Sequence, residues 1–228
     1  ERSLTQGSEQ AIWLATTSIS FDISILELLW TLTQGNKVVI QPDKPVAVPE
    51  LKETSFGLFY FAADNQSIGH KYDLLLEGAK FADTHGLSAV WVPERHFASF
   101  GDQFPNPSVA AAAIAATTNH VRIRSGSVVV PIHDPIRVAE EWSMVDNLSK
   151  GRVELSMASG WNPNDFVLAP EQYQNRHAIM RDHIDAIKSL WHGESISRIN
   201  GVGKPFDVTL HPKPVQKDLS IWITAAGS

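Results

Sequence analysis

The sequence predicts an α/β protein built on a parallel sheet. From Thr54 onward, short apolar runs alternate with segments whose apolar residues recur at helical spacing, and no internal sequence repeat explains this alternation. Repeated strand-helix units connect by right-handed crossovers, so they form a parallel sheet covered by helices. Five such units are expected, which is the beginning of either a doubly wound sheet or a (β/α)8 barrel.

Two observations favour the barrel. A nucleotide-binding doubly wound sheet carries a Gly-rich fingerprint after its first strand, and residues 62–65 have none. Small residues instead follow the later strands, at Ser156 and 158–160 and again at 225–228. Their backbone amides can cradle a phosphate at the carboxyl ends of barrel strands, although any single Gly or Ser there is also an ordinary turn residue.

The periodicity assigns the elements of this region. Strands are predicted at 56–61, 89–92, 122–130, 153–157 and 221–225. Helices are predicted at 72–85, 107–117, 136–148 and 177–191. Pro107 suits the first turn of its helix, and Gly86 and Gly193 suit helix C-termini.

A separate N-terminal segment precedes this region. Strands at 11–16 and 37–40 flank a predicted helix at 23–32, and we expect these strands to have no partner within the segment. Prolines at 42, 45 and 49 mark a linker between Gln41 and Glu53. We therefore divide the chain into residues 1–48 and a second domain at 49–228.

Composition excludes several functions. The chain has 228 residues, 43% of them hydrophobic, which can bury a sizeable core. A net charge of -6 without a run of Lys or Arg argues against nucleic acid or an anionic membrane as partner. No apolar stretch approaches the roughly 20 residues of a bilayer span. The absence of Cys excludes disulfides and a thiolate nucleophile, and no metal is expected. Without an initiator Met or a signal pattern, the chain is expected to be a cytoplasmic piece of a longer polypeptide.

The stretch 90–97 is the main candidate for chemistry. Its apolar strand is stopped by Pro93, and Glu94, Arg95 and His96 follow consecutively. Charged groups at the carboxyl end of a strand are where parallel α/β proteins place their active sites. An ordinary surface turn with solvated charges is the alternative interpretation.

Motifs along the second domain recur in a known order and spacing. They lie at 91–97, 106–107, 126–131, 133–141, 146–152, 160–161 and 190–191. Together they resemble the luciferase-like family of flavin-dependent monooxygenases, which are (β/α)8 barrels. The resemblance implies a barrel truncated after about five βα units, with three strands and their helices missing.

The N-terminal segment has its own resemblance. Residues 15–24, 27–30 and 32–40 are similar to the Phe-Asp-x-Ser motif and flanks of a nonribosomal peptide synthetase adenylation domain. In that family the Asp, here Asp22, binds the α-amino group of the selected amino acid; the phosphate loop and catalytic Lys are absent. Monooxygenase domains inserted into adenylation domains follow this motif, which is the order seen here.

The luciferase-like resemblance implies a cofactor site for FMN, supplied in reduced form by a separate reductase. Gly126 and Ser127 match a cis peptide bulge under the isoalloxazine. Ser159 with Gly160, and Gly227 with Ser228, match two phosphate-facing loops. Tyr173 and His177 match polar residues over the cofactor, although His177 could equally be a structural histidine.

Two departures from bacterial luciferases bear on the chemistry. Arg95 replaces the first of two adjacent histidines, and a guanidinium is a poor general base. The base role is therefore expected of His96, with Arg95 steadying an enolate oxygen and Glu94 beside them. Luciferases also have an arginine where this chain has Ser159.

The combined resemblance implies α-carbon hydroxylation of an aminoacyl thioester on a carrier protein, within secondary metabolite biosynthesis. The expected partners are that carrier-bound substrate, the remainder of the synthetase and a flavin reductase. Two alternatives stay open. The barrel could transfer hydride with a flavin or deazaflavin, or the domain could be a catalytically silent spacer in the synthetase.

Overall fold

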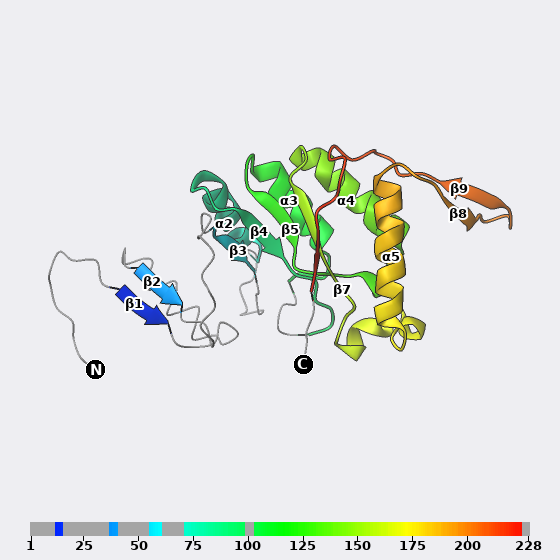
Figure 1. Cartoon of the computed structure of the whole chain (residues 1–228), viewed down its shortest axis with the longest axis horizontal. Helices are drawn as coiled ribbons and strands as arrows, with labels where there is room; N and C mark the ends of the chain where they lie inside the picture. Colours follow the sequence, from blue (N-terminus) through cyan, green and yellow to red (C-terminus); the bar gives the residue numbers. More distant parts are fainter. Residues whose placement is uncertain (1–11, 16–36, 41–54, 61–70, 99–102, 225–228) are drawn as a thin grey trace, which may run out of the picture. The chain divides into compact units, whose positions relative to one another are not determined.

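The computed structural model describes residues 12–15, 37–40, 55–60, 71–98 and 103–224 (Figure 1). The chain divides into two compact units, 1–54 and 55–228. In the first unit, β1 (Ile12–Ala15) pairs in parallel with β2 (Lys37–Ile40). The expectation that these strands lack partners within their segment is wrong, because positions 16–36 are long enough for a parallel crossover. Asp22 and the predicted helix lie outside the described residues.

The second unit contains a parallel sheet. Its strands along the main path are β3 (Gly57–Phe59), β4 (Ala89–Val92), β5 (Arg122–Ser125), β7 (Val153–Ala158) and β10 (Ile221–Ile223). They pair in chain order, β3-β4-β5-β7-β10, and every pairing is parallel. A doubly wound sheet reverses its strand order at a switch point, whereas a barrel winds sequentially. The described sheet therefore has the winding of the predicted barrel type.

Among the described residues, four helices cover this sheet, each within one residue of its predicted ends. They are α2 (Asp73–Thr84), α3 (Pro107–Thr117), α4 (Pro135–Ser149) and α5 (Arg176–Trp191). Pro107 occupies the first turn of α3, and the Asn106 side chain accepts the backbone N–H groups of Ser108 and Val109. Successive helices pack against one another, so they form a continuous outer layer (Figure 1).

Alternation along the strands separates two environments. One set of side chains is buried under the helices and forms the core: Val90, Val92, Ile123, Leu155 and Met157. The opposite face carries polar and aromatic side chains. There Arg124 Nε donates to Glu154 Oε2 at 2.6 Å. The Arg124 guanidinium lies 4.9 and 4.8 Å from the ring centroids of Trp91 and Trp222. On the face of the sheet opposite the helices, the Arg124 guanidinium is thus paired with Glu154 and lies against both indole rings.

The third strand is not continuous from 122 to 130, as predicted, but breaks after β5 and resumes as β6 (Val128–Val129). Both pieces pair with β7. Ile123 and Val128 are five residues apart, whereas their partners Val153 and Met157 are four apart, so the broken strand contains a one-residue bulge. The bulge coincides with a cis peptide between Gly126 and Ser127, as the resemblance implied.

At this bulge, side-chain hydrogen bonds replace backbone hydrogen bonds between the neighbouring strands. Ser125 is fully buried, and its hydroxyl accepts the Ser156 backbone N–H and donates to the Ser156 carbonyl, both at 2.8 Å. Gly126 N–H donates to the Val92 carbonyl on the other neighbouring strand at 2.7 Å. Buried backbone groups are therefore paired even where the regular register is lost.

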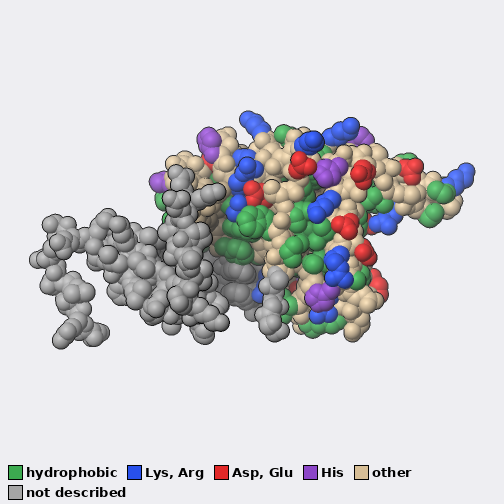
Figure 2. All heavy atoms as spheres, viewed as in Figure 1, with side chains coloured by type: hydrophobic (Ala, Val, Ile, Leu, Met, Phe, Trp, Pro, Cys, Tyr) green, Lys and Arg blue, Asp and Glu red, His purple; other side chains and the backbone are tan. Residues whose placement is uncertain are grey.

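An antiparallel hairpin between α5 and β10 was not predicted. It consists of β8 (Ile196–Ile199) and β9 (Pro205–Val208). Its sequence signal is the Asn200-Gly201 turn between two short runs. On the face shown in Figure 2, side chains of both charges are interspersed over the described residues. Within the part of the chain that the structure describes, no helix has the length and apolarity to cross a membrane.

Candidate functional site

A cavity of about 300 Å³ lies at the carboxyl ends of the sheet strands. Its aromatic walls come from Phe59, Trp91 and Trp161. Charged side chains from the loop after β4 and from η2 (Pro163–Leu168) also line it: Glu94, Arg95 and Asp165. This is the edge at which parallel α/β proteins carry their active sites. The surface-turn alternative for residues 94–96 therefore does not describe Glu94, whose side chain is fully buried.

Three hydroxyl groups from different parts of the sheet meet in the cavity lining. Ser127 Oγ lies 2.5 Å from Thr224 Oγ1, and Ser156 Oγ lies 2.8 Å from the same atom. Ser156 Oγ also donates to Ser127 Oγ at 3.3 Å. A hydroxyl can donate or accept, so this cluster can hydrogen-bond to either kind of ring heteroatom. The sequence predicted Ser127 for the cofactor ring and named Ser156 only among small residues near a phosphate; the fold adds Thr224 and brings the three hydroxyls together.

Gly126 allows close packing at the bulge. A Cβ at this position would lie 2.7 Å from the Phe59 ring. Real Cβ contacts are not this short, so only Gly at position 126 allows the Phe59 ring to occupy its place in the cavity lining.

The loop after β7 contains the predicted phosphate-facing pair. Gly160 lines the cavity with a φ of 78°, and a Cβ there would lie 2.8 Å from both Phe166 and Val129. Ser159 is half-buried and is not among the cavity-lining residues. Arg176, the first residue of α5, donates from Nε to the Gly160 carbonyl at 3.1 Å. Arg176 therefore places a guanidinium beside this loop, which the sequence did not indicate.

Two further predicted cofactor residues, Tyr173 and His177, lie outside the cavity lining. Tyr173 packs edge-on against Phe166 at 4.9 Å between centroids, and the Arg176 guanidinium lies 4.6 Å from its ring. His177 is exposed on the first turn of α5. Neither side chain lines the cavity. Gly227 and Ser228 lie outside the described residues.

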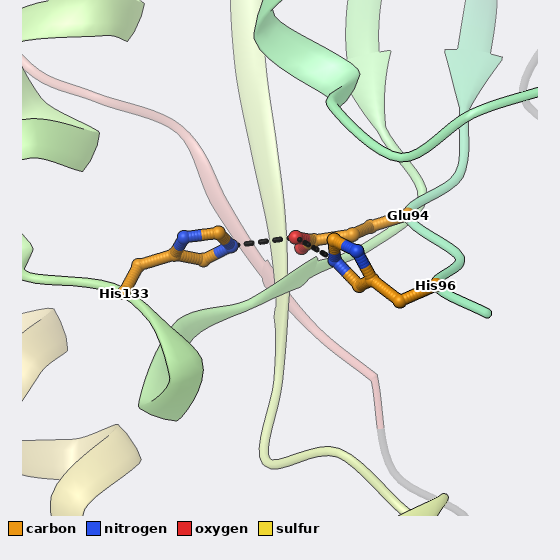
Figure 3. Close-up of side chains that lie close together, drawn as sticks. All are labelled: Glu94, His96 and His133. Atoms are coloured by element: carbon orange, nitrogen blue, oxygen red, sulfur yellow. Dashed lines mark hydrogen bonds and ion pairs between the residues drawn. The ribbon is translucent and has the colours of Figure 1, made fainter. Parts of the chain in front are cut away.

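Glu94 is the centre of a hydrogen-bonded cluster with two histidines (Figure 3). Its Oε1 accepts from His96 Nε2 at 2.9 Å and from His133 Nε2 at 2.5 Å. Its Oε2 accepts the Val129 backbone N–H at 2.6 Å. Figure 3 shows the two imidazoles approaching the carboxylate from opposite sides. The structure thus joins two predicted residues to His133, which follows η1 (Val130–Ile132) and was only part of a family motif.

The cluster fixes protonation states. Burial alone would raise the pKa of Glu94, but the hydrogen bonds from His133 and His96 outweigh it and bring the pKa below its ordinary value. An ionised carboxylate only accepts hydrogen bonds, so both imidazoles donate from Nε2. Burial likewise lowers the pKa of His133, but the hydrogen bond and charge of Glu94, with the charge of Glu141, raise it overall.

These three side chains are of types that also bind metal ions, and their polar atoms lie within 4.8 Å of one another. Two ligands of one tetrahedral zinc, each about 2.0–2.1 Å from the metal, stand roughly 3.3 Å apart. The oxygen-nitrogen separations here, 2.9 and 2.5 Å, are shorter and are those of direct hydrogen bonds. The geometry is therefore that of a proton-sharing cluster.

Arg95 and Asp165 bring opposite charges to the cavity. The Arg95 guanidinium lies 5.1 Å from the Trp161 ring centroid. Asp165 is 3% exposed, and its Oδ1 accepts from Asn162 Nδ2 at 2.9 Å. Burial raises the pKa of Asp165, and the nearby Arg95 guanidinium only partly opposes this rise. His96 is 9% exposed and is not one of the residues that line the cavity, although it lies close to Asp165.

Asp165 was missed by sequence reasoning, and no local signal marks it. It lies in the polar run Asn162-Pro163-Asn164-Asp165, which is typical of a turn. Its burial comes from η2 folding back over the strand ends, a tertiary contact that local sequence does not show.

Comparison with known proteins places this geometry in a family. The chain is 33% identical over 167 residues to the oxygenase component of flavin-dependent trigonelline monooxygenase from Acinetobacter baylyi. That match covers 72% of this chain and 46% of the relative, so the chain spans about half the length of the relative.

Solved structures agree on the fold. Monooxygenase RslO1 from Streptomyces bottropensis superposes with a TM-score of 0.68 at 27% identity, over 76% of this chain and 54% of that one. The oxygenating constituent of 3,6-diketocamphane monooxygenase from Pseudomonas putida, solved with FMN, gives 0.63 at 17% identity over 75% and 51%. The sequence model of the luciferase-like monooxygenase family matches residues 54–228, which contain the described strands β3 to β10 and the cavity. The chain therefore belongs to that family.

Proposed function

We propose that the protein is a flavin-dependent monooxygenase that holds reduced FMN in the cavity at the strand ends. The observation that carries this proposal is the cavity itself, in which the Gly126-Ser127 bulge, the hydroxyl cluster and three aromatic walls converge. A trigonelline monooxygenase relative that is an oxygenase component supports both the activity and a separate reductase as partner.

The lining residues fit a flat aromatic cofactor with polar ring edges. Phe59 and Trp91 offer apolar surfaces, and Ser127 with its partner hydroxyls can bond ring heteroatoms. Gly160 and the adjacent Arg176 guanidinium would hold the phosphate. Arg176 thereby supplies the charge that luciferases provide with an arginine at the position of Ser159. Bound reduced flavin supplies the electrons that activate dioxygen.

The chain's own groups would handle the substrate proton. His96 Nε2 is held by Glu94, so Nδ1 carries the free lone pair; since Arg95 lines the cavity and His96 does not, Nδ1 would accept the proton from a substrate carbon on the Arg95 side. The electron pair of the broken C–H bond then forms an enolate, whose oxygen the Arg95 guanidinium stabilises. Trp91 and Trp161 limit water at the reacting carbon. The resulting nucleophilic carbon is what an electrophilic oxygen requires.

We further propose that the substrate is an aminoacyl thioester on a carrier protein, hydroxylated at its α-carbon. The support is the sequence alone: residues 1–48 resemble an adenylation-domain fragment with Asp22 in its amino-acid pocket, followed by the domain at 49–228. The acidity of thioester α-protons suits a histidine base. The remainder of a synthetase and its carrier protein are the partners this proposal requires.

One experiment tests the proposal and separates its alternatives. The intact protein is supplied with reduced FMN, labelled dioxygen and the loaded carrier, and the carrier-bound product is analysed by mass spectrometry. Incorporation of one labelled oxygen is the expected result. Reversible cofactor reduction without incorporation would identify a hydride transferase, and failure to bind any flavin would identify a spacer domain.

A further inference from the structure

We propose that His133 is a positioning residue that carries the proton balancing buried Glu94, and that it thereby leaves His96 neutral with Nδ1 free to accept a proton. Glu94 is fully buried and touches both imidazoles through one oxygen. A buried carboxylate needs a compensating positive charge. One of the two histidines must supply it, and the structure distinguishes between them.

Solvation favours His133 as the charged member. Its side chain is 32% exposed, against 10% for His96. Because burial penalises the charged form of an imidazole, the proton costs less on the more exposed ring. The contact lengths agree, since the His133 contact to Glu94 is 2.5 Å and the His96 contact is 2.9 Å. Because the attraction between opposite charges rises as their separation falls, a positive charge is stabilised more on the imidazole that lies closer to the carboxylate.

The surrounding charges agree as well. On the α4 side, His133 faces Glu141, which also accepts from Arg137 Nη2 and Ser108 Oγ. Asp165 in η2 faces both Arg95 and His96, and burial raises its pKa, which weakens its charge.

One further titratable group lies against the same turn. His183 on α5 contacts the Val130 carbonyl at 3.3 Å through Nδ1. The described residues show no hydrogen bond between His183 and Glu94, so His183 offers a control of the same residue type beside η1.

The consequence is that the two histidines, His96 and His133, have different roles although their side chains are chemically identical. Glu94 orients His96 through Nε2, and His133 prevents Glu94 from drawing a second proton onto His96. Without His133, the carboxylate would be balanced by protonating His96, whose Nδ1 would then be occupied. The placement of the proton stands on the cluster geometry, whereas the use of His96 as a base rests on the proposed function.

Nitrogen NMR of the histidine side chains in the flavin-free protein tests this directly. At neutral pH, His133 should report two bound protons, and His96 should report one, on Nε2. His133→Gln keeps a hydrogen-bond donor but loses the charge, so the ratio of protonated to neutral His96 should rise about tenfold or more. His183→Gln should leave that ratio unchanged.

The outcomes decide separately between this inference and the proposed function. A doubly protonated His96 in the wild type, or an unchanged His96 ratio in a folded His133→Gln variant, overturns the inference. If His133→Gln does not fold, Glu94→Gln provides the second variant: the protonated fraction should fall at His133 and stay low at His96, and a fall at His96 instead overturns the inference. If the NMR results hold while no oxygen enters the substrate, the proposed function fails and the proton placement stands.

Discussion

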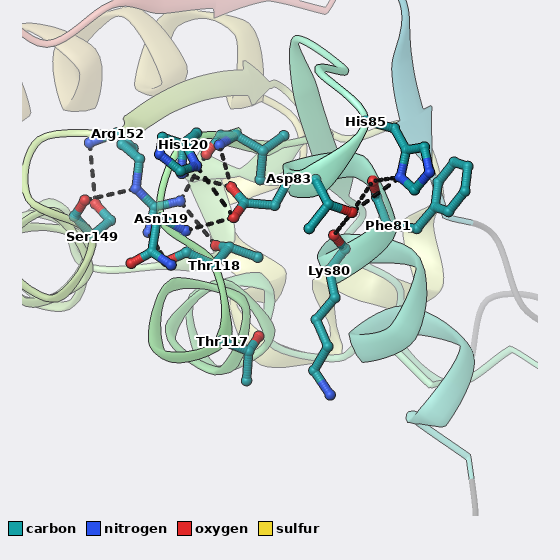
Figure 4. Close-up of polar contacts among 12 residues, drawn as sticks. Lys80, Phe81, Asp83, His85, Thr117, Thr118, Asn119, His120, Ser149 and Arg152 are labelled. Carbon is teal, nitrogen blue, oxygen red and sulfur yellow. Dashed lines mark hydrogen bonds and ion pairs between the residues drawn. The ribbon is translucent and has the colours of Figure 1, made fainter.

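The two ends of the parallel sheet use buried charge in opposite ways. At the amino ends of the strands, Asp83 accepts three backbone N–H groups, from Asn119, His120 and Val121, at 2.9, 2.6 and 2.8 Å (Figure 4). The side chain of its neighbour Arg152 donates five hydrogen bonds, four of them to backbone carbonyls of nearby loops and helices. At the carboxyl ends, Glu94 is bonded mainly to side chains that can themselves gain or lose protons.

The difference separates stability from chemistry. Backbone groups cannot change protonation, so the charges at the amino ends lock the loops that enter β5 and β7. Asp146 repeats the arrangement, accepting from the backbone of Val215 and Gln216 before β10. At the carboxyl ends, imidazoles can gain or lose a proton near neutral pH, and hydroxyls can exchange donating for accepting a hydrogen bond. Substitutions at the amino ends should therefore lower the free energy of unfolding, whereas substitutions at the carboxyl ends should lower turnover.

The largest effect is expected from Arg152→Met. The carbonyls of Ala115, Thr118 and Val121 would lose a charged donor in a buried place, which should lower the free energy of unfolding by about 3–5 kcal/mol. Urea denaturation measures this loss. Arg137→Met, which removes two ion pairs of a largely exposed guanidinium, should cost about 1 kcal/mol or less. Equal losses in the two variants would show that the amino-end network does not stabilise the fold.

At the other end, His96→Ala should lower turnover by about a hundredfold, the effect of losing an acid-base group. Flavin affinity and the free energy of unfolding should change little, because Glu94 keeps His133 and the Val129 N–H. Steady-state kinetics and a flavin titration provide the two readings. His85→Ala, an exposed histidine at the end of α2, is the control. Normal turnover in His96→Ala would remove His96 from the mechanism.

Asp83 gives the amino end a pH dependence of known sign. Burial would raise the pKa of Asp83, but the three backbone hydrogen bonds outweigh it and lower the pKa below its ordinary value. A lowered folded-state pKa contributes stability above the unfolded-state value, about 3.9, which is lost as pH falls through the folded-state value. Melting temperatures between neutral pH and about pH 2 should fall less steeply in Asp83→Asn than in the wild type. Parallel curves would assign the acid sensitivity to other groups.

A pair of glycines separates backbone strain from packing at the phosphate-facing loop. Gly160 and Gly193 have φ values of 78° and 88°, but only a Cβ at Gly160 would meet other atoms, at 2.8 Å. Gly193→Ala should cost about 1 kcal/mol from its backbone alone. Gly160→Ala should cost about 1 kcal/mol more and also weaken flavin binding. Calorimetry measures the difference, and identical losses would place Gly160 in open space.

The smallest effect is expected from Ser127→Val. The variant deletes one hydroxyl from the cluster but keeps a shape suited to extended backbone, so flavin binding should weaken by about tenfold with the fold intact. Fluorescence titration with FMN measures the dissociation constant. Ser197→Val, on the exposed face of β8, is the matched control. An unchanged dissociation constant for Ser127→Val would show that the bulge does not contact the cofactor ring.

Sequence patterns predicted the elements well and their contacts poorly, for physical reasons. Apolar periodicity locates α3 and β4 to the residue because it reports which face each element buries. It could not show that Arg124 and Glu154, both inside predicted strands, face inward and pair. The pleat gives two faces, and only tertiary structure decides which one the helices cover.

The candidate site was predicted where the chain is locally continuous. Glu94, Arg95 and His96 follow one strand, and a strand end is visible in sequence. His133 lies 39 residues from Glu94, and Arg176 lies 16 residues from Gly160. Such pairs depend on how successive units are wound. Secondary-structure propensity and residue spacing do not show which distant side chains come into contact when successive βα units pack side by side.

The stacking of Arg124 between Trp91 and Trp222 has an optical consequence. Trp91 forms part of the cavity wall, and the rings of Trp91 and Trp222 lie 5.8 Å apart with a guanidinium against each. Indole emission responds to nearby charge and to acceptors that absorb in its range, and oxidised flavin is such an acceptor. The molecule therefore carries an intrinsic reporter in the wall of its own cavity, and Trp91→Phe would identify how much of any quenching on ligand entry originates there.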